Sequence, residues 1–254
     1  MSTLEPREQS LEIGAPVFNG QPEDYWVGRI ETADPALRQS LFDAAAKLRG
    51  QAYLELGYVS PDRVDHKGRE IDDDDARSIH FTALERLSDG TSRIVGNSRL
   101  ITKDSLDNPL PIERYFPEAF ADNPIQPGFV EVSRLIAVHE NPRLRHKIAL
   151  ALIRSMIKHT VPMGIHESYC IVEDPLLRLL NSIGIPAEPL GEPKFIPDQN
   201  GLLKPVRMEH VRSIDPEYME QIGKTAMRNF FFDGGHGSDG FYDDSFIRKN
   251  HELR

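Results

Sequence analysis

Phe129-Val-Glu-Val-Ser-Arg-Leu-Ile-Ala-Val138 is the most strand-like stretch of the chain. β-branched and apolar residues dominate it, and Gly128 and Pro142 mark its two ends, so the stretch predicts a central β-strand. Glu131 and Arg134 interrupt it. Because charged side chains are seldom buried without a partner or a role, we expect the functional site to be built on this strand.

Helices and strands are predicted in the sequence both before and after this strand. Apolar residues three and four apart predict a helix over 35–56, which begins after Asp34 and ends at Gly57. The segments 78–87 and 93–102 are strand-like, and the Asp-Gly pair between them is typical of a hairpin. Further along the chain we expect a helix over 144–159, a strand over 167–172, a helix over 175–183 and short strands near 189–196 and 203–212. This order predicts an α/β (α+β) domain with a mixed sheet.

Two segments lie outside the predicted domain, which spans 34–212. Residues 1–33 mix Pro, Gly and charge without a period and are interpreted as an N-terminal arm. Residues 213–254 are interpreted as a C-terminal helix, from Asp215 to about Phe231, followed by a flexible tail.

The composition excludes several classes of protein. Among 254 residues, 40 acidic and 30 basic side chains give a net charge of −10, which argues against nucleic acid as a partner. No apolar run approaches the roughly 20 residues that span a bilayer, and the first residues do not resemble a secretion signal, so we expect a cytoplasmic protein with no membrane span. The single cysteine, Cys170, is interpreted as a small core residue.

Motifs for metals and dinucleotides do not fit. A calcium loop starting at Asp72 requires Gly where Arg77 stands and Glu where Ala83 stands. The glycines of 235–240 lie too close to the end of the chain for a dinucleotide-binding unit. We therefore expect no metal site and no bound cofactor.

The remaining candidates are charged residues at costly positions. Arg49 lies late in the first helix, Asp72 and Asp75 lie in a long acidic loop, and Arg99 interrupts a strand. Taken singly, these residues are as consistent with an ion-pair network that anchors the loop to the sheet as with a site. Their occurrence together with Glu131 favours a site.

Four motifs in order resemble those of the autoinducer (acyl-homoserine-lactone) synthases. They are Arg49-x-x-x-Tyr53, Glu70-x-Asp72-x-x-Asp75, Val95-Gly96-x-x-Arg99-Leu100 and Glu131-x-Ser133-Arg134. The resemblance covers about residues 40–212 and implies an acyltransferase of the GNAT superfamily, with a mostly antiparallel sheet, flanking helices and a splayed central strand pair.

The resemblance leaves the acceptor open. Close relatives with the same framework make N-acyl amino acids, and Asp75-x-x-Ser78-x-His80 is more similar to those relatives. Members that make lactones usually carry a Trp shortly after the first motif, where this chain has Gly57-Tyr58-Val59. The implied acceptor is a small amino-acid-derived amine, with S-adenosylmethionine as one candidate.

The chemistry of acyl transfer assigns a role to Glu131. A carboxylate in a partly desolvated strand has a raised pKa and can act as the general base that deprotonates the amine. Strict alternation along the strand would place Glu131 and Arg134 on opposite faces of the sheet, and the two side chains could approach one ligand only if a β-bulge lies between them. We therefore expect a β-bulge near Ser133. Acceptor binding is assigned to Arg49, Tyr53, Asp72, Asp75, Arg99, Ser133 and Arg134, and His80 is a possible second acid/base group.

The donor is expected to be a fatty acyl thioester of CoA or of an acyl carrier protein. Backbone N–H groups at Leu135, Ile136 and Val138 are expected to be unpaired and to bind the thioester and its pantetheine arm. Basic residues where this strand passes into a helix suit the donor's phosphates or an acidic carrier protein; they are Arg143, Arg145 and Lys147. A glycine-rich turn, usual in enzymes that use acetyl-CoA, is missing there.

Two alternatives stay open. One is an acetyltransferase of the same fold that uses acetyl-CoA, which the missing glycine-rich turn disfavours. The other is a catalytically silent module that binds a metabolite in the same cleft, which the intact Glu131 and Arg134 disfavour.

Overall fold

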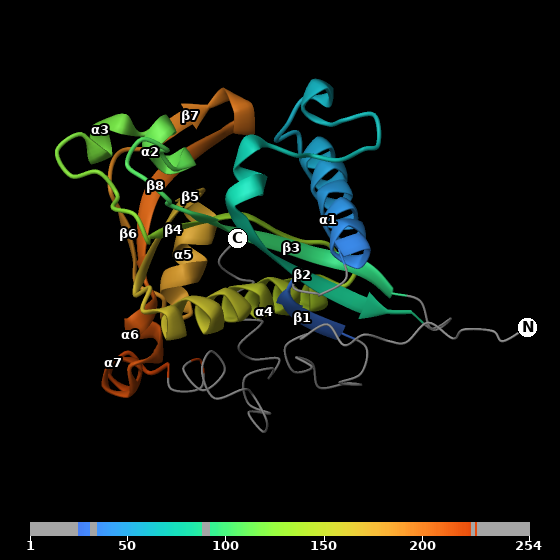
Figure 1. Ribbon diagram of the computed structural model, residues 1–254. Coiled ribbons are helices and arrows are strands. Elements are labelled where there is room, and N and C mark those ends of the chain that lie inside the picture. The colour runs from blue at the N-terminus through green and yellow to red at the C-terminus, as the bar shows by residue number, and fades with distance from the viewer. Residues whose placement is uncertain (1–24, 31–34, 88–91, 225–226, 228–254) are drawn as a thin grey trace, which may run out of the picture.

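An eight-stranded sheet runs through the computed structural model, which describes residues 25–30, 35–87, 92–224 and 227 (Figure 1). The strand order is β1-β2-β3-β4-β5-β8-β6, and β7 pairs with β8 beside this path. Only β4 and β5 are parallel among these pairs. The strands are β1 Tyr25–Arg29, β2 Ser78–Arg86, β3 Ser92–Thr102, β4 Val130–Ala137, β5 Glu167–Val172, β6 Ala187–Pro189, β7 Lys194–Ile196 and β8 Gly201–Glu209. This confirms the predicted mixed, mostly antiparallel sheet.

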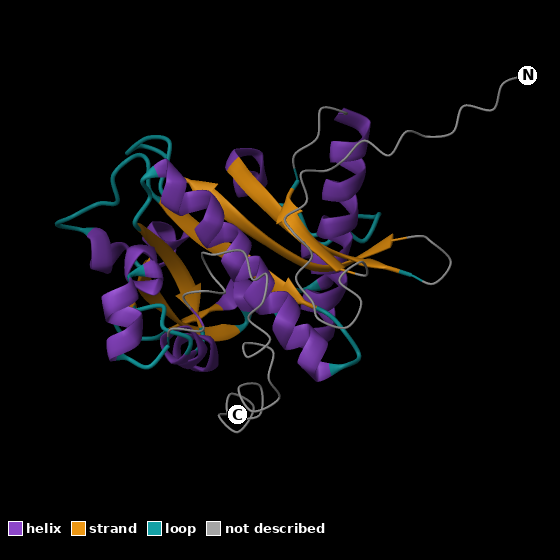
Figure 2. Cartoon of the chain, turned by 90° about the horizontal axis from the view of Figure 1, so that it is seen from below, coloured by secondary structure: helices purple, strands orange, loops and turns teal. Residues whose placement is uncertain are grey.

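The two longest helices cover opposite faces of the sheet. α1 (Pro35–Leu56) packs against β3 and β4 on one face, and α4 (Pro142–Thr160) crosses β1 to β4 on the other (Figures 1 and 2). The shorter helices are α2 Pro111–Tyr115, α3 Pro117–Phe120, α5 Asp174–Ser182, α6 His210–Ile214 and α7 Pro216–Gln221. Short 3-10 helices are η1 Pro61–Arg63, η2 Asp73–Arg77, η3 Val161–Met163 and η4 Pro197–Gln199.

Local sequence explains where α4 begins. The side chain of Asn141 accepts a hydrogen bond from the N–H of Arg143 (2.9 Å), and Pro142 occupies the first turn. Apolar side chains along one stripe, such as Ile148 and Leu152, are fully buried against the sheet. The helix therefore starts where β4 ends and is fixed by the core beneath it.

β4 and β5 separate halfway along their length. Their parallel pairing ends at Val132 and Cys170, although β4 continues to Ala137. The expected splayed strand pair is thus confirmed. A gap opens beyond Val132, on the side where β4 lacks a neighbour from β5.

A β-bulge lies in β4 directly after Ser133. Ser133 is opposite Arg99 and Ile136 is opposite Asn97, so Arg134 and Leu135 face the single residue between the two partners. Arg134 has a φ of 57°, in the left-handed region that residues other than glycine seldom adopt. The bulge expected near Ser133 is confirmed.

Three features differ from the sequence-based expectations. Residues 25–29, assigned to an arm, form the edge strand β1, whose five residues are too few to give a clear period. The segment 103–127, for which the sequence predicted no helix or strand, contains α2 and α3. The C-terminal helix is shorter than predicted, since α7 is capped by Asp215 and ends before Gly223, which has a φ of 70°. The predicted tail lies outside the described residues, and within the described part no helix is long and apolar enough to cross a membrane.

Candidate active site

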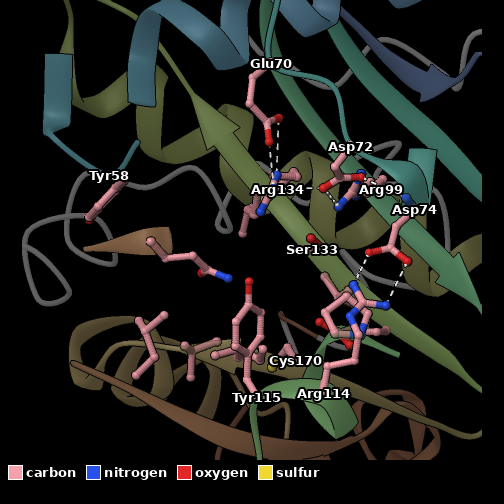
Figure 3. Close-up of a pocket in the computed structure, with 18 of the residues that line it drawn as sticks. Tyr58, Glu70, Asp72, Asp74, Arg99, Arg114, Tyr115, Ser133, Arg134 and Cys170 are labelled. Atoms are coloured by element: carbon pink, nitrogen blue, oxygen red, sulfur yellow. Dashed lines mark hydrogen bonds and ion pairs between the residues drawn. The ribbon is translucent and has the colours of Figure 1, made fainter. Parts of the chain in front are cut away.

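A cavity of about 1160 Å³ occupies the gap between β4 and β5 (Figure 3). One part of its lining is charged and comes from the loop before β2, from α2 and from β4. The other part is apolar and comes from β4, β5, α5 and β8; its residues include Val132, Leu135, Cys170, Ile171, Leu176, Leu180 and Met208. A single cavity therefore offers charged groups and an apolar chamber.

Buried ion pairs join α1, the acidic loop and β3. Arg49 donates to both carboxylate oxygens of Asp75 (2.9 and 2.7 Å). Arg99 donates to Asp75 (2.7 Å) and, through two nitrogens, to Asp72 (2.6 and 2.7 Å). Both arginine side chains are 1% exposed. These contacts anchor the loop to the sheet, as the ion-pair interpretation of the sequence proposed.

The ion pairs close into a ring through the bulge residue. Arg134 donates to Asp72 (2.9 Å) and to Glu70 (2.7 Å), and Glu70 lies 2.9 Å from Nε of Arg49. We call this set the charge ring; its members, in order, are Arg49, Asp75, Arg99, Asp72, Arg134 and Glu70. Cations and anions alternate around it, and three of each give no net charge.

The backbone of the acidic loop holds the carboxylates of the charge ring in place. Asp72 caps η2 by accepting from the N–H of Asp74 (3.1 Å), while Asp75 accepts from the N–H of Asp72 (3.1 Å). The N–H of Glu70 donates to Ala46 of α1 (3.0 Å). The acidic run is therefore a capped turn docked on α1.

Electrostatics keep the carboxylates of Asp72 and Asp75 ionised. Burial by itself raises the pKa of Asp72, but hydrogen bonds from Arg99 outweigh this effect, and the pKa lies well below its usual value. The pKa of Asp75 is likewise lowered, because Arg49 offsets the effect of burial. Within the charge ring, the side chains of Asp72 and Arg134 are partly exposed, and both residues line the cavity.

Glu131 lies beside the charge ring, on the same face of the sheet. Arg99 and Ser133 are cross-strand partners, and Glu131 is two residues from Ser133, so all three side chains share that face. The carboxylate of Glu131 accepts a hydrogen bond from the N–H of Ile112 in α2 (2.8 Å). Burial raises the pKa of Glu131 to about 8. Its carboxyl group therefore exchanges a proton close to neutral pH.

A second charged cluster faces the cavity and was not predicted from the sequence. Asp74 is buried and accepts from Nε and Nη2 of Arg77 (3.1 and 2.6 Å). Arg114 of α2 also binds Asp74 through both terminal nitrogens, and it donates to the carbonyl of Pro109 (2.9 Å) (Figure 3). Two cations thus share one carboxylate.

The strand backbone corrects one expectation about the donor site. The N–H of Val138 was expected to be unpaired, but it donates a hydrogen bond to the carbonyl of Val95 (2.8 Å). Ile136 lies two residues from Val138 and opposite Asn97, so alternation turns its N–H toward β3 as well. The N–H of Ala137, between them, points away from β3 and toward the gap.

The other predicted residues occupy different positions around the site. Tyr53 lines the cavity, and the guanidinium carbon of Arg134 lies 5.5 Å from the centre of its ring. His80 lies on the far side of Asp75, 3.3 Å from its carbonyl, and its ring packs edge-on against Phe42. Burial lowers the pKa of His80. The basic residues Arg143, Arg145 and Lys147 lie in the first two turns of α4, and the cavity lining does not include them.

Comparison with known proteins agrees with this arrangement. Residues 48–153 match the family model of the acetyltransferase (GNAT) domain, and this range contains the whole charge ring and Glu131. A search of curated protein sequences found no match.

Among solved structures, the chain is similar to BjaI, a CoA-dependent acyl-homoserine lactone synthase, with a TM-score of 0.58 and 22% identity over 78% of this chain and 90% of BjaI. It is similar to the acyl-homoserine lactone synthase LasI, with a TM-score of 0.53 and 20% identity over 73% of this chain and 89% of LasI. It is also similar to FeeM, an N-acyl amino acid synthase from uncultured soil microbes, with a TM-score of 0.51 and 16% identity over 78% of this chain and 95% of FeeM. The fold implied by the resemblance in the sequence is confirmed.

Proposed function

We propose, from the match of residues 48–153 to the acetyltransferase (GNAT) domain, that this chain is an N-acyltransferase that moves a fatty acyl group from a thioester to a small amino-acid-derived amine. One observation carries the proposal. Glu131, a buried carboxyl with a pKa raised to about 8, faces a large cavity at the point where β4 and β5 separate. A carboxyl with such a pKa is matched to proton transfer from an amine at physiological pH.

The apolar chamber supports a fatty acyl group over an acetyl group. Side chains from four elements, β4, β5, α5 and β8, line it, among them Leu176 and Leu180 of α5 and Met208 of β8. An acetyl group has one methyl and would leave most of this chamber in contact with water. Burial of a longer chain contributes about 0.8 kcal/mol for each CH₂ group.

The reaction follows from the position of Glu131. Its carboxylate takes a proton from the ammonium group of the acceptor, and the resulting amine attacks the carbonyl carbon of the thioester. Negative charge develops on the carbonyl oxygen, and the N–H of Ala137, aimed at the gap, is a donor suited to it. The C–N bond forms and the C–S bond breaks. The leaving thiolate takes the proton from Glu131, and the nitrogen of the new amide releases one of its two protons to water, so one proton is set free for each amide formed.

The donor is proposed to be a CoA or acyl carrier protein thioester. Arg143, Arg145 and Lys147 form a basic turn where β4 passes into α4, which suits phosphate groups or an acidic carrier protein. The relative BjaI is described as CoA-dependent. Such thioesters are consistent with a cytoplasmic location, which we propose for this chain.

The acceptor is proposed to bind at the charged part of the lining. Asp72 and Glu131 attract an ammonium group, and Arg134 with Tyr53 forms the adjoining wall. A structure of BjaI contains S-adenosylmethionine and isopentyl-CoA, and FeeM is an N-acyl amino acid synthase. Both classes of amine are therefore candidate acceptors.

A donor and acceptor panel tests the proposal. The purified protein is incubated with acyl-CoA and acyl carrier protein donors of increasing chain length, each with S-adenosylmethionine or with the twenty amino acids, and products are identified by mass spectrometry. We expect one acylated amine, favoured with donors longer than acetyl. Preferred acetylation would favour the acetyltransferase alternative, and no product from a folded protein with any pair would favour a binding module.

A further inference from the structure

We propose that Arg114 binds a carboxylate group of the acceptor, so that the acceptor is an α-amino acid or a close derivative that keeps its free carboxylate. This inference rests on the proposed function and specifies its substrate class. Arg114 belongs to none of the motifs that resemble the synthases, and it would set specificity for the acceptor without taking part in proton transfer.

The arginines of the charge ring are poorly placed for this role. Arg49 and Arg99 are 1% exposed, and their guanidinium groups bind carboxylates of the charge ring. The side chain of Arg134 is 16% exposed, and its guanidinium group already forms ion pairs with Glu70 and Asp72. Because the charge ring is neutral, an additional anion there would compete with a carboxylate that is already bound.

Unlike the charge ring, the cluster of Asp74, Arg77 and Arg114 contains more cations than anions. Arg77 and Arg114 share the one buried carboxylate of Asp74, which leaves one positive charge in excess. A second carboxylate, that of Asp104, also lines the cavity, but it is 54% exposed and its ion pair is with Arg77, at 3.7 Å. The excess charge therefore lies on the side of Arg114, whose side chain is 42% exposed.

The guanidinium group of Arg114 is oriented by the protein and retains capacity for a ligand. Nη1 donates to the carbonyl of Pro109, and both terminal nitrogens contact Asp74. A guanidinium carries five N–H donors in a planar fork, so further donors stay available on this exposed group. Pairing of a carboxylate with such a fork is short, charge-assisted and specific in geometry.

α2 fixes Arg114 relative to the proposed base. The N–H of Ile112 holds the carboxylate of Glu131 at 2.8 Å, and Arg114 follows two residues later in the same helix. The side chains of Glu131 and Arg114 line the same cavity. In Figure 3, Ser133 lies between the Arg134–Glu70 pair and the Arg114–Asp74 pair. An amino acid places its ammonium and carboxylate on one carbon. This arrangement suits an amine directed to Glu131 and a carboxylate directed to Arg114.

The test compares acceptors that differ only in this carboxylate. Wild type and Arg114→Gln are assayed with the amino acid that gives most product and with the carboxamide of that amino acid. For wild type we expect kcat/KM about 10- to 100-fold higher for the amino acid than for the carboxamide, the range for hydrogen bonds to a charged group. In Arg114→Gln, KM for the amino acid rises by a similar factor, the two acceptors become equivalent, and KM for the donor is unchanged.

Control variants separate this role from general effects of charge or folding. Asp74 keeps both hydrogen bonds from Arg77 in Arg114→Gln, so we expect the melting temperature to change little. Arg63→Gln removes another arginine from the cavity lining and should preserve the preference for the free carboxylate. Equal use of the two acceptors by wild type, an equal effect of Arg63→Gln, or a rise in KM for the donor alone would overturn the proposal.

A binding assay separates this proposal from the proposed function. Melting temperatures are measured without donor, with each of the twenty amino acids and its carboxamide. If wild type transfers no acyl group, the proposed function fails, and the role of Arg114 is decided here. Stabilisation of wild type by an amino acid, but not by its carboxamide and not in Arg114→Gln, supports the proposal. No preference of wild type for a free carboxylate contradicts it.

Discussion

Glu131 and Arg134 lie three residues apart in β4, yet their side chains lie on the same face of the sheet. Arg134 binds Asp72, which also binds Arg99, and Arg99 is the cross-strand partner of Ser133. An unbroken strand would turn Arg134 to the other face. The bulge, with Arg134 at a φ of 57°, is what brings the proposed base and the charge ring to one cavity.

The charge ring is expected to be essential for stability. Asp75→Asn removes the carboxylate that Arg49 and Arg99 share, and it leaves buried cations with weakened partners. We expect a loss of about 3–5 kcal/mol in the free energy of unfolding, the usual result of breaking a buried ion pair. Urea unfolding measures it, with the exposed Asp62→Asn as the control; equal stability of the two variants would contradict the role of the charge ring.

Close packing between α1 and the acidic loop predicts the effect of Gly50→Ala. A Cβ atom at Gly50 would lie 2.4 Å from the backbone oxygen of Gly68, so the loop that carries Glu70 must move. We expect a loss of about 1–3 kcal/mol in unfolding free energy, as for other overpacked sites, together with reduced acyl transfer. Gly191→Ala is the matched control, since its nearest contact is an ordinary 3.6 Å, and a harmless Gly50→Ala would refute the docking.

Glu131 is expected to make the fold less stable as pH rises from about 5 to 8. Burial raises its pKa from an ordinary value of 4.5 to about 8, so between these values the unfolded chain releases a proton that the folded chain retains. Stability contributed by this group is therefore lost as pH rises from about 5 to 8. Glu131→Gln cannot titrate, and its Oε1 can still accept from Ile112. Its melting temperature relative to wild type should rise between pH 5 and pH 8, and a constant difference would show that Glu131 is ionised in the folded protein.

The same pKa predicts the pH dependence of catalysis. As a general base, Glu131 must be deprotonated in the free enzyme, so kcat/KM should rise about tenfold per pH unit below about 8 and level off above it. The acceptor amine contributes its own titration, which Glu131→Gln retains. The pH profiles of kcat/KM for wild type and Glu131→Gln, measured with one acceptor, should differ only in the rise below about pH 8 that Glu131 contributes. Profiles of identical shape would show that another group accepts the proton.

Much of the fold could be predicted because its signals are local. The apolar spacing of 35–56 gives the bounds of α1, and the β-branched run around Glu131 gives β4. By contrast, β1 and α2 have five residues each, and they depend on pairing with β2 and on contacts with Glu131. Such short elements carry too few residues for a period to appear.

The site could be predicted only in part. The long acidic loop and the charged residues that interrupt strands pointed to the charge ring, since charged side chains are costly at such positions. Arg114 gave no such signal, because its partner Asp74 lies 40 residues earlier in the chain. The N–H of Val138 was misjudged for a related reason. Which amides β3 uses depends on the register beyond the bulge, and the sequence does not give that register.

Release of free thiol from an acyl donor is the most direct test of the central claim. Wild type, Glu131→Gln and the exposed control Glu118→Gln are compared with and without acceptor, and product is confirmed by mass spectrometry. We expect acceptor-dependent release by wild type and Glu118→Gln, and a fall in kcat of about 10²- to 10⁴-fold in Glu131→Gln, the usual contribution of general base catalysis. Undiminished release by a folded Glu131→Gln would contradict the assignment of Glu131 as the base.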